Sequence, residues 1–190
     1  MLECLREAKA IGADAKVYNT AIHVLISARR LGPASALLEE MKSKGIHFDL
    51  ATFSLWMIVI ARNRNASRGQ VFGLLAEMDR VGLVPDAAIF NAMFRVRNIR
   101  PSEVLHEMRR RRVRRDAFTD KAYVLTSLHR GNLARGLAAM RRIHDWTPRF
   151  LETVVVQLRK CNRDDLASQI LSDARSRKID FPNFEGNSDK

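Results

Sequence analysis

Three segments of the sequence share one frame. They read EMKSKGIHFD at 40–49, EMDRVGLVPD at 77–86 and EMRRRRVRRD at 107–116. All three follow Glu-Met-x-x-x-Gly-[Ile/Leu/Val]-x-x-Asp, except that Arg112 replaces the glycine of the third. A frame that recurs at such a period indicates stacked copies of one small unit, because a lone unit of this size cannot bury its own apolar face.

An aspartate marks the start of each unit. Successive aspartates are separated by 35, 37 and 30 residues, and they are Asp14, Asp49, Asp86 and Asp116. The first three are followed, four and five residues later, by an aromatic residue and a small polar residue: Tyr18-Asn19, Phe53-Ser54 and Phe90-Asn91. Residues 167–182 align with residues 34–49 without a gap. The pattern predicts an all-α fold, an αα-solenoid of about five helix-turn-helix repeats.

Each repeat is expected to contain two helices. In the first repeat the sequence predicts helices at about 16–28 and 33–45, since proline suits a helix's first turn and Gly45 suits a left-handed stop. In the second it predicts helices at about 52–62 and 67–80. The first of these two is apolar on nearly all sides, which is typical of a helix between neighbouring repeats.

The helical-repeat domain is expected to span residues 14–181. Residues 1–13 read as the second helix of an incomplete leading repeat, and residues 183–190 as a disordered tail. The third repeat is shortened between its helices. The last two repeats keep the two-helix pattern but lack the aromatic and small polar residues that follow the aspartate in the first three. The repeats are expected at about 15–49, 50–86, 87–116, 117–147 and 148–182.

The net charge of +12 is concentrated in the middle of the chain. Residues 1–60 carry about +1, residues 61–150 about +11 and residues 151–190 about zero. Such a regional excess favours a polyanionic partner over a general solubility effect. For the six arginines within 107–116, a phosphate backbone is the favoured counterpart, because guanidinium groups make forked contacts to phosphate oxygens. A merely solvated basic face and an acidic protein or import receptor stay open.

No pattern for catalysis, metal binding or membrane insertion is present in the sequence. Cys4 and Cys161 lack zinc spacing, and the five histidines have no second ligand at a metal-binding distance along the chain. The longest apolar run, 55–61, is too short to span a bilayer. We therefore expect a non-enzymatic chain with no cofactor, no metal, no small-molecule substrate and no membrane partner. No secretory signal or organellar presequence is visible.

The first repeat carries a family resemblance. Tyr18-Asn19-Thr20, the run ARRLGPASALLEEMKSKGI at 28–46 and the closing Asp49 resemble the pentatricopeptide repeat (PPR) family. The tetratricopeptide repeat, which prefers Trp, Gly and Tyr marks, fits less well. The resemblance implies a right-handed superhelix that binds single-stranded RNA, one base per repeat. It also implies an organellar location, with the mitochondrion favoured over the chloroplast.

In that family a base is read by the fifth residue of a repeat together with its last residue. An amide at the fifth position can donate and accept hydrogen bonds, so it can recognise a base edge. The residue that sandwiches the base is typically a branched aliphatic, whereas this chain has Lys16, Ala51 and Ala88 there. Carried over, the base-reading pairs are Asn19 with Asp49, Ser54 with Asp86, and Asn91 with Asp116. They imply a preference for U, then a purine such as G, then U, with the RNA running 5′ to 3′ along the chain.

Phosphate contacts are predicted separately from base contacts. In the fourth repeat Lys121 occupies the fifth position, where it can bind a phosphate but does not discriminate bases. The candidate phosphate-binding residues are Arg109, Arg110, Arg111, Arg112, Arg114, Arg115 and Lys121.

The expected function is that of a non-catalytic RNA-binding protein that contacts single-stranded organellar RNA in RNA processing, stability or translation. One alternative is a structural subunit or assembly factor of an organellar ribosome or ribonucleoprotein, which would hold ribosomal RNA and neighbouring proteins. Another is a protein-binding helical scaffold.

Overall fold

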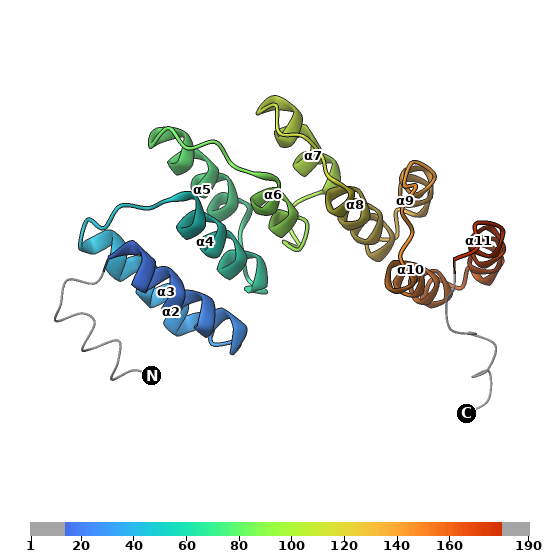
Figure 1. Cartoon of the computed structure of the whole chain (residues 1–190), viewed down its shortest axis with the longest axis horizontal. Coiled ribbons are helices and arrows are strands. Elements are labelled where there is room, and N and C mark those ends of the chain that lie inside the picture. Colours follow the sequence, from blue (N-terminus) through green and yellow to red (C-terminus); the bar gives the residue numbers. More distant parts are fainter. Residues whose placement is uncertain (1–13, 180–190) are drawn as a thin grey trace. The chain divides into compact units, whose positions relative to one another are not determined.

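The computed structural model describes residues 14–179. These residues form ten α-helices and no strand (Figure 1). The leading helix predicted at 1–13 and the tail predicted at 183–190 lie outside the described residues. The chain divides into two compact units, with the boundary between Arg114 and Arg115. None of the described helices is both long and apolar enough to cross a bilayer.

Unit 1 consists of three helix pairs. The first helix of each pair packs against its partner, and the three first helices also pack side by side in a row. The predicted bounds of the first two pairs agree with the structure to within about two residues. The pairs are α2 (Ala15–Ser27) with α3 (Leu31–Ser43), α4 (Leu50–Arg62) with α5 (Arg68–Arg80), and α6 (Ala87–Met93) with α7 (Pro101–Arg110).

Unit 2 consists of two further pairs. They are α8 (Ala117–His129) with α9 (Leu133–Met140), and α10 (Pro148–Lys160) with α11 (Asp164–Ser176). The first helices α8 and α10 again pack against each other. The core of this unit combines the aromatic rings of Trp146 and Phe150 with aliphatic residues that have no exposed surface, among them Leu128, Val154 and Leu158.

The shared Met-x-x-x-Gly segment forms a helix stop. At the end of α3, Gly45 has φ +64°, and the N–H of Ile46 donates to the carbonyl of buried Met41 at 3.0 Å. This geometry satisfies carbonyls that the helix itself leaves unpaired. The equivalent bonds, both 2.9 Å, run from Leu83 to Met78 and from Val113 to Met108. The third stop forms although Arg112 replaces the glycine, and Arg112 takes φ +57°.

The aspartate that closes the frame begins the next helix. The carboxylate of Asp49 accepts a hydrogen bond from the N–H of Thr52 at 2.7 Å, at the start of α4. Side-chain caps of this kind contribute about 1 kcal/mol each, because the first N–H groups of a helix have no partner within it. The same cap forms at Asp14, Asp86 and Asp116. The frame therefore encodes a stop and a start, and so fixes the turn from one repeat into the next.

Candidate nucleic-acid interface

Asn19, Asp49 and Thr52 form one hydrogen-bonded group where α2 meets α4. Asn19 Nδ2 donates to Asp49 Oδ1 at 3.2 Å, and Thr52 Oγ lies 2.9 Å from Asn19 Oδ1. The structure thus brings the first predicted base-reading pair into direct contact. A side-chain amide has two N–H donors and two acceptor lone pairs, so Asn19 keeps one of each for a ligand. Because Asn19 is half-buried and held at both ends, its amide is oriented in advance.

Asp49 serves two purposes in this group. Its Oδ1 also lies 2.8 Å from the Thr52 hydroxyl, whose single proton can serve either Asp49 or Asn19 at one time. Burial pushes the pKa of Asp49 upward, but the hydrogen bonds from Thr52 and Asn19 together outweigh it and hold the pKa below its ordinary value. Asp49 is therefore ionised at neutral pH, caps α4 and orients the Asn19 amide.

The second predicted pair is not joined by a hydrogen bond within the described residues. Ser54 is half-buried on α4, and Asp86 is half-buried at the start of α6. Asp86 Oδ1 accepts the N–H of Ile89 at 3.0 Å, so this carboxylate also acts as a cap. The Ser54 hydroxyl makes no bond to another described residue, which leaves it available to a ligand.

The third predicted pair is divided between the two units. Asn91 lies on α6 in unit 1, whereas Asp116 caps α8 in unit 2. Asn91 is 9% exposed, and its Oδ1 has no hydrogen-bond partner among the described residues. An unpaired buried polar atom costs roughly 1–3 kcal/mol. Asn91 therefore differs from the half-exposed Asn19, although the two occupy the same position in the frame.

Half of the predicted arginine cluster is engaged in ion pairs. Arg110 binds Glu107 at 2.9 Å, and Arg115 binds Asp120. Arg111 binds both Glu107 and Asp79, and its side chain is 10% exposed. Because Asp79 lies on α5, Arg111 ties α7 to α5, and its hydrogen bond lowers the pKa of Asp79. Arg111 is thus mainly a structural residue, with little surface left for phosphate.

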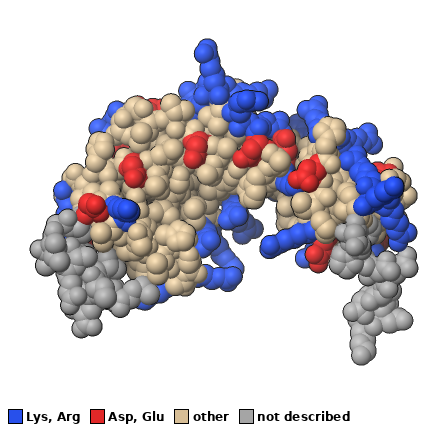
Figure 2. Space-filling view, in the orientation of Figure 1, with Lys and Arg blue, Asp and Glu red and all other residues tan. Residues whose placement is uncertain are grey.

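The other half of the cluster is open to solvent. Arg109, Arg112 and Arg114 are exposed and have no acidic partner in the part of the chain that the structure describes. Figure 2 shows basic side chains gathered at the end of α7, where these residues lie. Lys121, by contrast, is 17% exposed and binds Asp145 at 2.9 Å. The exposed arginines are therefore the better phosphate ligands.

Phe118 is a candidate that the sequence analysis missed. It is 57% exposed on α8 and stands two residues after Asp116. Counting along the frame places it at the same position as Lys16, Ala51 and Ala88, so the spacing alone could have located it. An exposed aromatic ring can stack on a base, which contributes about 1–3 kcal/mol. Within residues 14–179, no cluster of three or more metal-binding side chains is present.

Comparison with known proteins matches part of this chain to a known repeat family. A family model described as the pentatricopeptide repeat domain matches residues 36–98, which include the hydrogen-bonded pair's Asp49 and the second repeat. Residues 36–98 therefore match the pentatricopeptide repeat domain. No curated protein gives a significant sequence match.

Solved PPR structures share its fold. The maize protein PPR10 superposes with a TM-score of 0.68 at 23% identity, over 96% of this chain and 27% of PPR10. PPR10 in complex with an 18-nt psaJ RNA element superposes with a TM-score of 0.66 at 23% identity, over 90% of this chain and 26% of that one. The PPR domain of Arabidopsis thaliana protein-only RNase P 1, in complex with tRNA, superposes with a TM-score of 0.62 at 11% identity. The match covers 86% of this chain and 90% of that domain. The chain thus spans about a quarter of the maize protein, and the predicted all-α helical-repeat solenoid is confirmed.

Proposed function

We propose that this chain is a PPR protein that binds single-stranded RNA along its first helices without catalysis. Maize PPR10 has been solved with an RNA element and the Arabidopsis PPR domain with tRNA, and both share this fold. Because these proteins are only 23% and 11% identical to this chain, the likeness shows a shared fold, and the case for RNA binding rests on this chain's own residues. The observation that carries it is the Asn19–Asp49–Thr52 group, which presents an oriented amide on α2.

The remaining bonds of Asn19 suit a uracil. The Watson–Crick edge of uracil presents an N–H next to carbonyl oxygens, and Asn19 retains one acceptor lone pair and one N–H donor. Asp49 is ionised and would repel a phosphate, so it favours the base edge over the backbone at this position. Ser54 offers a second, less selective contact on α4.

Exposed arginines supply affinity that does not depend on sequence. Arg109, Arg112 and Arg114 are exposed and form no ion pair with any described residue, so their guanidinium groups can bind phosphate oxygens. Each phosphate neutralised on a single strand contributes about 0.7 to the slope of log affinity against log salt. Replacing all three with alanine should therefore lower that slope by roughly 2 if each binds one phosphate.

The test separates base reading from phosphate docking. Fluorescence anisotropy is measured with a U-rich and an A-rich oligonucleotide of equal length, for Asn19→Ala and for Arg109→Ala with Arg114→Ala. His23→Ala, an exposed change on the same helix, is the matched control. Asn19→Ala should reduce the ratio of the affinity for the U-rich oligonucleotide to that for the A-rich one. The arginine variant should lower the affinity for both oligonucleotides by the same factor. If Asn19→Ala leaves the preference unchanged while the arginine variant abolishes binding, the chain docks on phosphate and does not read bases.

That second outcome would support a structural subunit or assembly factor of an organellar ribonucleoprotein. The burial of Asn91 favours this candidate, because it leaves few positions that can read a base. Co-sedimentation with ribosomal particles after mild lysis separates it from an RNA-processing or translation factor. Placement in an organelle, with the mitochondrion favoured, belongs to the proposal and is tested by imaging the tagged chain.

A further inference from the structure

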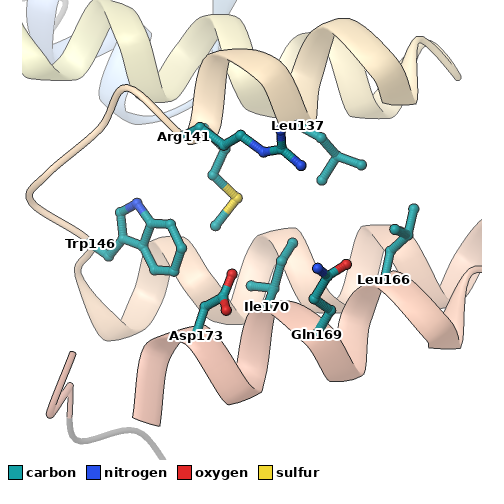
Figure 3. Close-up of a pocket in the computed structure, with 8 residues that line it drawn as sticks. Leu137, Arg141, Trp146, Leu166, Gln169, Ile170 and Asp173 are labelled. Carbon is teal, nitrogen blue, oxygen red and sulfur yellow. The ribbon is translucent and has the colours of Figure 1, made fainter. Parts of the chain in front are cut away.

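A pocket in unit 2 lies between the second helices α9 and α11 (Figure 3). Its apolar lining comes from Leu137 and Met140 on α9, Leu166 and Ile170 on α11, and Trp146 on the connection after α9. The cavity volume is about 70 Å³, several times the roughly 10–15 Å³ that a single water needs. A space of this size and character suits the end of one aliphatic side chain.

One basic and one acidic side chain line this pocket. Arg141 lies on the α9 side and Asp173 on the α11 side, and neither forms an ion pair with any described residue. Figure 3 shows the Asp173 carboxylate and the Gln169 amide pointing from α11 toward α9. In unit 1 the neighbouring second helices α5 and α7 are bridged by Arg68–Glu103 and Arg111–Asp79. The α9–α11 pocket has no such bridge.

Trp146 lines the same pocket with its indole ring. The residue is 7% exposed, and its Nε1 is buried without a hydrogen-bond acceptor in the described chain. The guanidinium of Arg177 covers one face of the indole, with its central carbon 4.0 Å from the ring centroid. Native proteins leave few buried donors unpaired, because each costs roughly 1–3 kcal/mol. The indole therefore contributes its apolar ring to the pocket wall, while its N–H has no partner among the described residues.

We propose that this pocket docks a segment of a partner protein that inserts one aliphatic side chain between α9 and α11. The segment places a carboxylate against Arg141 and a Lys or Arg side chain against Asp173. A helix with an acid, an aliphatic residue and a base spaced three or four residues apart carries these groups on one face. RNA is the poorer occupant, because Asp173 would repel a phosphate and most of the lining is apolar. Docking here is independent of RNA binding along the first helices.

The experiment selects random helical peptides, displayed on phage, against the full-length chain. The enriched peptides should share an aliphatic residue flanked by an acid on one side and a base on the other. Their affinity should fall at least about tenfold in Arg141→Glu and in Asp173→Lys, because a charge enclosed in an interface loses its partner. Arg142→Glu and Glu152→Lys make the same charge changes at exposed positions outside the pocket and should have no effect. The double variant Arg141→Glu/Asp173→Lys should regain affinity for a peptide with its acid and base exchanged.

Two results would overturn the proposal. The first is enrichment only of peptides whose affinity is the same in the pocket variants and the control variants, which would place binding elsewhere, on the exposed arginines for instance. The second is occupation of the pocket by this chain's own residues 180–190. With Trp56→Phe, Trp146 is the only tryptophan and its emission reports on the pocket. If Phe181→Ala with Phe184→Ala shifts that emission and strengthens peptide binding, the natural occupant is the chain itself.

Discussion

Replacing Arg112 with glycine should stabilise the protein and weaken its binding to RNA. Arg112 has φ +57° at the stop where the two preceding repeats have Gly45 and Gly82, with φ +64° and +74°. For a residue with a Cβ this left-handed conformation costs about 1–2 kcal/mol. Glycine loses more backbone entropy on folding, by roughly 0.5–1 kcal/mol, which offsets part of the gain. The net stabilisation is therefore about 0.5–1 kcal/mol.

Arg112→Ala is the matched control for this change. Both variants remove the same guanidinium, so their RNA affinities should fall equally, but only glycine relieves the backbone. Urea and thermal unfolding followed by circular dichroism should find Arg112→Gly more stable than Arg112→Ala by about 1 kcal/mol, or about 2–4 °C in Tm for a chain of this size. Equal melting temperatures for the two variants would refute the claim that the left-handed backbone is costly here.

Three further changes probe the fold and one probes the interface. Arg111→Met should lower the free energy of unfolding by up to about 1 kcal/mol in urea titrations, since it leaves Asp79 without a cation and Glu107 with Arg110 alone; Arg109→Met should be nearly neutral. Asp79 has a pKa lowered from 3.8 by Arg111, so its contribution to stability should be complete above about pH 4 and lost as the pH falls through the lower folded-state value. Asp79→Asn should flatten that part of the stability–pH profile, and an unchanged profile would exclude the pair as a source of stability. Gly136→Ala should cost about 1–3 kcal/mol in thermal unfolding, because its Cβ would stand 2.7 Å from a methyl carbon of buried Leu128. Phe118→Ala should weaken RNA binding by roughly 1–3 kcal/mol in anisotropy titrations if its ring stacks on a base, and unchanged affinity would remove it from the interface.

Local signals made most of the fold predictable. The segment from Met41 to Asp49 contains a buried anchor, a left-handed stop and the cap of the next helix, and each is specified by one residue type. Such signals act over a few residues, so the sequence reveals them directly. At Arg112 the same helix stop forms without glycine, because the other residues of the frame are enough to make its hydrogen bonds.

Features that depend on contacts between helices were not predictable in the same way. The sequence places Arg111 in a uniform arginine run, and only the structure shows that it binds Asp79, 32 residues away on α5. Asn19 and Asn91 are equivalent in the frame, yet one is half-exposed and the other buried, because the residues around them differ from pair to pair. The α9–α11 pocket likewise depends on how these two helices pack, and no sequence motif predicts it.

Photocrosslinking of a 4-thiouridine-substituted U-rich RNA, followed by mass spectrometry of the crosslinked peptides, tests the central claim most directly. The account predicts crosslinks within α2 and α4, on the peptides that carry Asn19 and Ser54, and fewer of them in Asn19→Ala. Crosslinks confined to α3 and α5, with the Asn19 peptide untouched, would contradict it.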